Sequence, residues 1–396
     1  MNKRHVKQLM KTINSPIGFL CALGIMAQTT AVALAENAIP DKESTDYINL
    51  LKNGGFEAVK EGETNYPADW RYYGSCVPGS WELTKPGHEG KQCVRLWSDE
   101  PGWHGGVIQN FRFESNRRYK MSSWIKSRLS EGGELTLLAV NMTYIFIQDG
   151  QKTNKLWFAD AGVKKGSFDW QYIEKTFETP TNAAETLNGE AYLVQFGGQG
   201  EVWVDDARLA DMGPVKLGKE LYSMPFDDPK LWKVSAHVNE APMELPEGVS
   251  IQKDGKHECE GKPGLKLNYR FMSPKHDAIL LTSAVSIPGG SLLALRVYGD
   301  GSGHELDAVL FDKNGEAHYL PIGTVCWHGW NTVYKSFGGL CLGPANKRHV
   351  SCKHWGGDNN QTLEFPITRI TVGLNDQPDE FKGKGEITFG WLKVYE

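Results

Sequence analysis

The chain has 396 residues, of which 11% are aromatic and 23% are charged, and its formal net charge is −5 at pH 7. A nucleic-acid-binding protein needs concentrated positive charge against the phosphate backbone. The acidic balance therefore argues against nucleic acid as a partner, and the length is sufficient for two domains.

Residues 1–35 are typical of a secretory signal peptide that is removed from the mature chain. An apolar run at 17–27 follows a basic start, and Ala33-Leu34-Ala35 provides small residues for cleavage. The run is too short to span a bilayer and no longer one follows, so we expect no membrane span. These features predict a secreted, periplasmic or cell-surface protein with a flexible lead-in at 36–47.

Removal of this segment changes the charge and the cysteine count. Taking its four basic residues from 43 leaves 39 Lys and Arg against 48 Asp and Glu, a mature net charge of −9. An even number of cysteines in an oxidising compartment predicts disulfides, and Cys76 with Cys93 and Cys341 with Cys352 are the plausible local pairs. The six mature cysteines are Cys76, Cys93, Cys259, Cys326, Cys341 and Cys352.

Short runs of alternating apolar and polar residues dominate the mature chain, and helical periodicity is almost absent. Such alternation is typical of β-strands, here separated by turns rich in Gly, Pro, Asp and Asn. We therefore expect an all-β fold. The clearest runs are 107–113, 119–128, 135–142, 192–196, 292–298 and 305–311.

Two similar strands divide the mature chain. Residues 200–209 and 385–395 both begin with Gly-Glu and then alternate, and each closes a block of similar length. This repeat predicts two tandem β-sandwich (jelly-roll) domains. The expected boundaries are 48–211 for the first domain, 212–218 for a linker and 219–396 for the second domain.

The first domain contains a series of short motifs. They are Asn53-Gly54-Gly55-Phe56-Glu57, Trp70, Tyr119-Lys120-Met121-Ser122-Ser123-Trp124-Ile125-Lys126, Phe168-Asp169-Trp170-Gln171 before Phe177-Glu178-Thr179-Pro180, and Val202-Trp203-Val204-Asp205-Asp206. In this order they resemble the jelly-roll carbohydrate-binding modules of the family 4, 9 and 22 type. The resemblance implies polysaccharide binding and a structural calcium ion held by Glu57 and one of Asp205 or Asp206.

Strand geometry limits which carboxylates can bind this implied ion. Strict alternation places Asp205 with Trp203, on the face opposite Val202. Only one of Asp205 and Asp206 can therefore join Glu57 at the sheet edge, where hard oxygen ligands suit calcium. The alternative is that both aspartates cap a turn in water.

The second domain contains a looser set of motifs. They are Phe226-Asp227-Asp228 with Trp232, Gly299-Asp300-Gly301-Ser302-Gly303, Asp312-Lys313-Asn314-Gly315 and Trp327-His328-Gly329-Trp330. These motifs resemble carbohydrate-binding sandwich modules of the family 11 type. A long insertion at 338–365 departs from that pattern and leaves open whether this domain binds a glycan.

Six residues of the first domain are candidates for contacting a glycan. If the apolar residues of each strand face the core, a polar and aromatic set remains on the exposed face. Aromatic rings stack on the C–H faces of sugars, and Arg, Lys and Gln donate to hydroxyls. The basic residues favour an acidic glycan, although an ordinary solvated sheet also carries such side chains. The candidates are Arg95, Trp97, Trp124, Lys126, Arg128 and Gln195.

The catalytic motifs are incomplete. Glu305 and Asp307 form a carboxylate pair on one strand face, but Val309 and Leu310 stand where a laminarinase-like pattern needs a third carboxylate. A polysaccharide hydrolase or lyase is the alternative function, and a cell-surface adhesion protein is a third. The enzyme site would comprise Arg296, Tyr298, Glu305, Asp307, His318 and Trp330.

A zinc site formed by Cys341, Cys352, His349 and His354 is a further alternative, but export favours a disulfide between the two cysteines. We therefore predict a secreted, non-catalytic polysaccharide-binding protein built from tandem modules. Neither nucleic acid nor a membrane is an expected partner, and the sequence determines neither the glycan nor the oligomeric state.

Overall fold

The computed structural model of this protein describes most of residues 47–396. The predicted signal peptide and nearly all of the predicted lead-in lie outside the described part. Within that part, no helix has the length and hydropathy needed to cross a bilayer. The described residues are 47–74, 80–100, 104–130, 133–148, 151–159, 161, 163–181, 187–238, 241–272, 277–337, 353–376 and 383–396.

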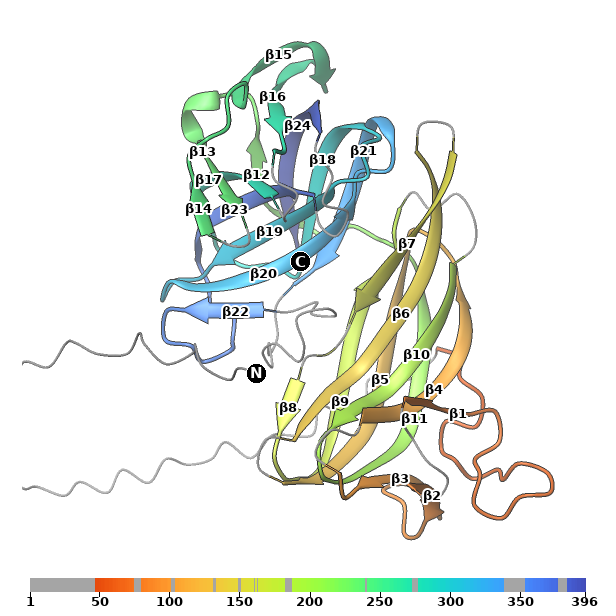
Figure 1. The fold of residues 1–396 in the computed structure, drawn as a ribbon. Helices are drawn as coiled ribbons and strands as arrows, with labels where there is room; N and C mark the ends of the chain where they lie inside the picture. Colours follow the sequence, from red (N-terminus) through yellow and green to blue (C-terminus); the bar gives the residue numbers. More distant parts are fainter. Residues whose placement is uncertain are drawn as a thin grey trace, which may run out of the picture. The chain divides into compact units, whose positions relative to one another are not determined.

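The described residues form strands β1–β24 and one short 3-10 helix, η1 (Pro229–Leu231). The strands pair antiparallel throughout, which confirms the prediction of an all-β fold. Strands β1–β11 form two sheets and β12–β24 form two others, and no strand is shared between the two groups (Figure 1). We refer to these groups as the first and the second sandwich.

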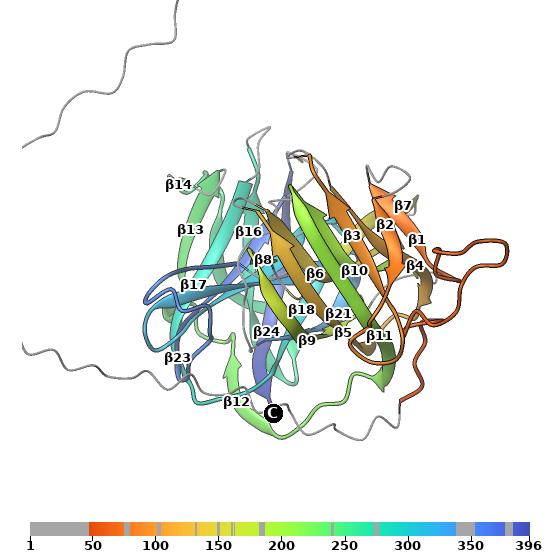
Figure 2. The ribbon, with the colours of Figure 1, turned by 90° about the horizontal axis from the view of Figure 1, so that it is seen from below.

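In the first sandwich, a six-stranded sheet has the order β1-β4-β10-β6-β7, with β8 paired to β6. The facing five-stranded sheet has the order β2-β3-β11-β5-β9. Strands β6 and β10 lie side by side in Figure 2, as their register requires. The bounds are β1 Arg71–Gly74, β2 Trp81–Thr84, β3 Cys93–Ser98, β4 His104–Phe113, β5 Arg117–Leu129, β6 Glu134–Gln148, β7 Gln151–Ala159, β8 Val163–Lys165, β9 Phe168–Glu178, β10 Leu187–Gly197 and β11 Gly200–Pro214.

In the second sandwich, one sheet has the order β15-β16-β24-β18-β21, with β12 paired to β24, and the other has the order β14-β13-β17-β23-β19-β20-β22. The bounds are β12 Glu220–Pro225, β13 Lys233–Val238, β14 Ala241–Met243, β15 Ser250–Cys259, β16 Lys262–Arg270, β17 Asp277–Ile287, β18 Leu292–Asp300, β19 Glu305–Phe311, β20 Glu316–Thr324, β21 His328–Ser336, β22 Lys353–Gly356, β23 Ile367–Asn375 and β24 Lys384–Tyr395.

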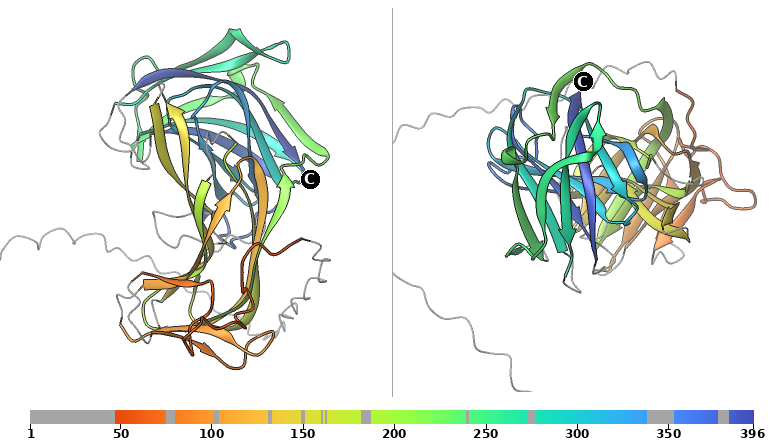
Figure 3. Two further views of the ribbon diagram at one scale, coloured as in Figure 1. Left: turned by 90° about the vertical axis from the view of Figure 1, so that its right-hand side faces the viewer. Right: turned by 90° about the horizontal axis from the view of Figure 1, so that it is seen from above.

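The two strands that were expected to close each block occupy equivalent places. Strand β11 lies between β3 and β5, and β24 lies between β16 and β18. In Figure 3, the dark blue β24 runs through the middle of its sheet. Each closing strand is therefore a central strand of its sheet. This position explains why apolar residues alternate along nearly the whole of both strands.

The core follows from period-two alternation. In β5, Met121, Ile125 and Leu129 are buried on one face. Aromatic rings fill the space between the sheets of the first sandwich, with the Tyr119 ring 5.2 Å from that of Phe113 and 5.8 Å from that of Phe177. Burial of each such side chain contributes roughly 1.5–3 kcal/mol relative to exposure.

A β-bulge interrupts the alternation of β11 after Asp205. The pairing with β5 shifts register between Asp205 and Arg208, and Asp206 has a φ of 46°. Asp205, just before the bulge, lies opposite Trp124 of β5 and is fully buried, whereas the neighbouring Asp206 is half-buried. The expectation that Asp205 shares the outer face with Trp203 is confirmed, because the regular pairing continues up to Asp205 and the bulge rotates only the residues that follow it.

Candidate functional site

The outward face of the β2-β3-β11-β5-β9 sheet brings together five of the six predicted ligand residues. Trp203 of β11 lies directly opposite Arg95 of β3 and Lys126 of β5. Glu201, two residues earlier, lies opposite Trp97 and Arg128, so all of these side chains share one face. The five predicted residues on this face are Arg95, Trp97, Trp124, Lys126 and Arg128.

The face also contains aromatic residues that were not among the candidates. Tyr172 of β9 lies opposite Trp124, with 5.5 Å between the ring centroids. Trp203 is at the centre of the face, and alternation with the buried Val202 and Val204 was the signal that could have found it. We call this surface the aromatic face; its aromatic members are Trp97, Trp124, Tyr172 and Trp203.

The sixth candidate, Gln195, is not on the aromatic face. It belongs to β10, which pairs with β4 and β6 in the other sheet of the sandwich. The expectation that Gln195 shares a surface with Trp124 is therefore wrong, because alternation within a strand does not reveal to which sheet the strand belongs. The side chain of Gln195 lies outside the described side chains.

Basic residues on the aromatic face lie over indole rings. The guanidinium of Arg95 is 4.8 Å from the centroid of Trp97, and that of Arg128 is 5.4 Å from the centroid of Trp203. The Lys126 ammonium is 5.9 Å from the same Trp203 ring. These contacts are within the range of cation–π attraction and hold the long side chains flat against the sheet.

The same basic residues have acidic partners. Arg95 forms an ion pair with Glu82 at 2.8 Å and another with Glu201. Burial opposes its charge, but the hydrogen bonds to both carboxylates more than offset this effect and raise the pKa of Arg95. Lys126 binds Asp169 at 2.8 Å, and this bond lowers the pKa of Asp169.

The aromatic face is therefore close to neutral. Its three cations, Arg95, Lys126 and Arg128, lie among three carboxylates, those of Glu82, Glu201 and Asp169. The expectation of a locally basic surface is wrong, because the sequence argument counted the cations of β3 and β5 without the carboxylates that neighbouring strands supply.

The loop between β2 and β3 covers part of Trp124. The imidazole of His88 stacks on the Trp124 indole, with centroids 3.7 Å apart and an interplanar angle of 19°. His88 also makes an edge contact with Trp170, at 5.4 Å between centroids. One face of the Trp124 ring is thus packed against a loop. The position of that loop therefore determines how the ring is presented to a ligand.

Two carboxylates hold this loop by its backbone amides. Asp205 Oδ2 accepts hydrogen bonds from the amides of His88 (2.7 Å) and Glu89 (3.0 Å). Glu57 Oε1 accepts from the amides of Lys91 (2.6 Å) and Gln92 (3.2 Å). We call residues 87–92 the anchor loop, since carboxylates from two distant parts of the chain fix it.

Glycines make this close approach possible. A Cβ atom at position 87 would lie 2.7 Å from Asp205 Oδ2, and one at position 90 would collide with Glu57 Oε1. Gly90 also has a φ of 77°, a conformation that side-chain-bearing residues rarely adopt. The anchor loop therefore requires glycine at both positions.

The two adjacent aspartates have different roles. Asp205 also accepts the Asp206 amide at Oδ1 (2.7 Å), and burial, partly offset by these amides, raises its pKa to about 6. Asp206 instead forms an ion pair with Arg208 at 3.0 Å. Asp205, and not Asp206, contacts the same loop as Glu57.

The second sandwich has a buried group of acidic and imidazole side chains that could hold a metal ion. It consists of Asp312, Glu316 and His318, whose potential ligand atoms all lie within 4.8 Å of one another. Asp312 and Glu316 are fully buried, and His318 is 5% exposed.

The residues of the alternative enzyme site are divided between two sheets. Arg296, Tyr298 and Trp330 belong to β18 and β21 of one sheet, where the Arg296 guanidinium is 5.7 Å from the Trp330 ring centroid. Glu305, Asp307 and His318 belong to β19 and β20 of the other sheet. The Asp307 carboxylate accepts a hydrogen bond from Asn375 at 2.7 Å. The expected six-residue cluster is therefore not formed.

The described cysteines are Cys93, Cys259 and Cys326, and all three are buried free thiols. The predicted bond between Cys76 and Cys93 is thus not formed in this structure, in which burial raises the pKa of the Cys93 thiol to about 12. Cys76, Cys341, Cys352 and His349 lie outside the described residues, so the predicted pair Cys341 and Cys352 stays a prediction.

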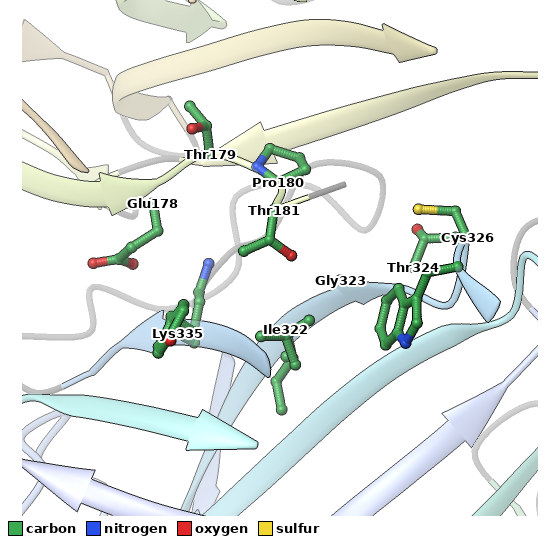
Figure 4. Close-up of a pocket in the computed structure, with 12 residues that line it drawn as sticks. Glu178, Thr179, Pro180, Thr181, Ile322, Gly323, Thr324, Cys326 and Lys335 are labelled. Carbon is green, nitrogen blue, oxygen red and sulfur yellow. The ribbon is translucent and has the colours of Figure 1, made fainter. Parts of the chain in front are cut away.

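A small cavity lies among residues 178–181 and 322–335 (Figure 4). Glu178 enters it and accepts a hydrogen bond from the Ser336 amide at 2.9 Å, while Arg118 pairs with the same carboxylate at 3.0 Å. Its volume of about 30 Å³ is comparable to that of one water molecule. The cavity is too small for a sugar ring.

Comparison with known proteins supports the sequence resemblance in the first sandwich. Residues 48–190 match the family model described as a carbohydrate binding domain. This match agrees with the resemblance indicated by the motifs of the same segment. A search of curated proteins found no match.

Several solved structures match the chain at low sequence identity and low TM-score. The CBM22-1-CBM22-2 tandem domain from Paenibacillus barcinonensis Xyn10C is 9% identical, with 88% of this chain and 98% of that chain covered and a TM-score of 0.26. TmCBM61 in complex with β-1,4-galactotriose is 20% identical over 41% of this chain and 99% of that chain, with a TM-score of 0.28. The C-terminal family 22 carbohydrate binding module of Clostridium thermocellum Xyn10B is 14% identical over 42% and 98%, with a TM-score of 0.26.

Proposed function

We propose that this protein binds polysaccharide through the aromatic face of its first sandwich and does not cleave it. The observation that carries the proposal is the gathering of four aromatic side chains with paired charged groups on one outward sheet face. Rings stack on the C–H faces of sugars, while the charged groups around them exchange hydrogen bonds with hydroxyls. The match of residues 48–190 to a carbohydrate-binding domain supports the same function.

The charge balance of the face favours a neutral glycan. Arg95 and Lys126 already have carboxylate partners, so an acidic sugar would have to compete with Glu82, Glu201 and Asp169. A neutral sugar needs no such exchange, because its hydroxyls can both donate and accept. This reverses the preference for uronate or sulfated glycans suggested by the basic residues alone.

We further propose that Glu57 and Asp205 hold the structural calcium ion that the family resemblance implies. Each carboxylate offers about four lone-pair directions. The backbone amides that Asp205 accepts number three and those that Glu57 accepts number two, so both retain capacity for a hard cation. Bound there, the ion would supply positive charge to the two carboxylates that fix the anchor loop.

The pattern of residues 1–35 supports action outside the cytoplasm, as expected for a protein that meets polysaccharide. The competing function is that of a cell-surface adhesion protein without a glycan site. The enzyme alternative has less support, because its six residues belong to two different sheets.

Affinity electrophoresis of the mature chain tests the proposal. Retardation is expected in gels that contain a neutral polysaccharide such as xylan, β-glucan or galactan, and it should be weaker in pectin or alginate. Trp124→Ala and Tyr172→Ala should abolish it, whereas Trp355→Ala, at a 47% exposed position in β22, should not.

Other outcomes distinguish the alternatives. Stronger retardation in acidic gels would restore the acidic-glycan hypothesis, and no retardation in any gel would favour the adhesion protein. Release of reducing ends from the same polysaccharides would contradict the non-catalytic function.

A further inference from the structure

The proposed glycan binding does not involve the buried group of carboxylates and imidazoles in the second sandwich. Asp312 follows β19, Glu316 and His318 belong to β20, and His354 belongs to β22. We call these four residues the carboxylate–histidine cluster. Its members come from a hairpin and from a strand that lies about 35 residues further along the chain.

Local geometry explains why the three residues of the hairpin converge. Asp312 Oδ1 accepts hydrogen bonds from the amides of Asn314 (2.8 Å) and Glu316 (2.9 Å), which closes the turn between β19 and β20. Glu316 and His318 are two residues apart on β20 and so share one face. His318 lies directly opposite His354 in the pairing of β20 with β22.

Three protein groups orient the carboxylate of Glu316. Its carboxylate accepts from His354 Nδ1 at 2.7 Å, from the Asn360 amide at 3.0 Å and from the Gln361 amide at 3.2 Å. These bonds join the β19–β20 turn to β22 and to the chain that follows it. They occupy three of the roughly four lone-pair directions of the Glu316 carboxylate, so that it retains capacity for one further ligand.

Asp312 and His318 each have a buried polar atom that protein groups leave without a partner. Among the described residues, the second carboxylate oxygen of Asp312, Oδ2, and the ring nitrogen Nε2 of His318 are buried without a hydrogen-bond partner. Asp312 is 0% exposed and His318 is 5% exposed. A buried polar atom without a partner costs about 1–3 kcal/mol, and more if it is charged. Potential ligand atoms of the two residues lie within 4.8 Å of one another, so one bound cation could satisfy both.

We propose that Asp312, Glu316 and His318 bind one zinc ion. Two carboxylates and one imidazole form a mixed oxygen and nitrogen ligand set, which suits zinc better than calcium or magnesium, whose sites are built from oxygen. The ion would neutralise the two buried carboxylates and take the lone pairs of Asp312 Oδ2 and His318 Nε2. His354, bonded to Glu316, orients that ligand from outside the metal site.

Neighbouring acidic residues are less suited to the ion. Asp358 and Glu364 also lie within reach of Asp312. However, Asp358 accepts from the Asn314 and Asn360 side chains, and Glu364 pairs with Lys313 at 2.8 Å. Both residues are more exposed than the cluster, so we assign them to the surface of the same turn.

Metal content and thermal stability of the mature, untagged chain test this proposal. After chelator treatment and dialysis, reloading should give about one zinc per chain and raise the melting temperature. Asp312→Asn and His318→Ala should lose the bound zinc and the thermal shift, and the control Asp358→Asn should keep both. His354→Ala should keep the site but weaken its affinity about 10–100-fold.

Folding of each variant is checked by its circular dichroism spectrum and by retention of glycan binding in the first sandwich. Cobalt substitution then identifies the ligands, because a carboxylate and imidazole site gives visible bands without a thiolate charge-transfer band. A thiolate band would overturn the assignment in favour of cysteine ligands. Failure of the wild-type chain to take up zinc, or equal uptake by folded His318→Ala, would also overturn it.

Discussion

Each sandwich uses carboxylates to hold a loop, but the two sites satisfy those carboxylates differently. In the first sandwich, Glu57 and Asp205 accept backbone amides of the anchor loop. In the second, Asp312 uses one oxygen for a turn and leaves the other without a partner among the described residues. The comparison teaches that burial of a carboxylate does not by itself indicate an ion, since what distinguishes the sites is the presence of unpartnered atoms.

The difference predicts unequal dependence on metal. The anchor loop can form without an ion because amide donors already surround its carboxylates, and calcium would only add to this arrangement. The carboxylate–histidine cluster contains buried acceptors that no described protein group satisfies, so its stability should depend strongly on its cation.

The largest effect is expected from removing the anchor of the first site. Asp205→Ala leaves three backbone amides without their acceptor, which should lower the free energy of unfolding by about 3 kcal/mol. Urea denaturation at pH 7 measures this change. The matched control Asp206→Ala loses only a half-exposed ion pair and adds strain at a left-handed position, and it should cost about 1 kcal/mol. Equal losses would show that the loop does not depend on Asp205.

The pH dependence of stability tests the raised pKa of Asp205 by comparing wild type with Asp205→Ala. Because the pKa of Asp205 is raised to about 6 in the folded state, its contribution to stability is full below the unfolded pKa near 4 and is lost as pH rises through about 6. The stability advantage of wild type over Asp205→Ala should therefore shrink by roughly 2 kcal/mol between pH 4 and pH 7 in chelator. Denaturation series at several pH values would detect it. An advantage that grows with pH would contradict the raised pKa.

A smaller effect tests whether the anchor loop positions Trp124. Gly90→Ala should disturb the contact with Glu57, lower the free energy of unfolding by about 1–2 kcal/mol and weaken glycan binding through His88. Gly62→Ala is the matched control, because Gly62 has a similar φ of 80° but nothing lies within 4 Å of its added Cβ. Titration calorimetry with the glycan that retards wild type compares the two. Identical affinities would mean that the loop and the aromatic face are independent.

Calcium should have the smallest effect. Addition of calcium to chelator-treated protein should raise the melting temperature by about 2 °C, because the ion binds the folded state only. The shift should be absent in Glu57→Gln and unchanged in His318→Ala, which separates this ion from zinc. If calcium leaves the wild-type transition unmoved, amides alone hold the anchor loop.

Much of the aromatic face could be predicted from the sequence. Alternation in the runs around Trp97 and Trp124 places Arg95, Lys126 and Arg128 on the same side as the two indoles, and the register confirms this arrangement. Period-two geometry is local, because each side chain points opposite to its neighbour whatever the rest of the chain does. The all-β fold followed from the same local rule.

The remaining features depended on tertiary structure. The anchor loop that covers Asp205, the placement of Gln195 in the other sheet, and the carboxylates of Glu82 and Asp169 that neutralise the face arise from contacts between distant parts of the chain. The carboxylate–histidine cluster likewise forms only when β22 brings His354 opposite His318. Alternation in the sequence indicates which residues share one side of a strand. Strand order and register decide which strands meet, and packing across the whole sandwich sets both strand order and register.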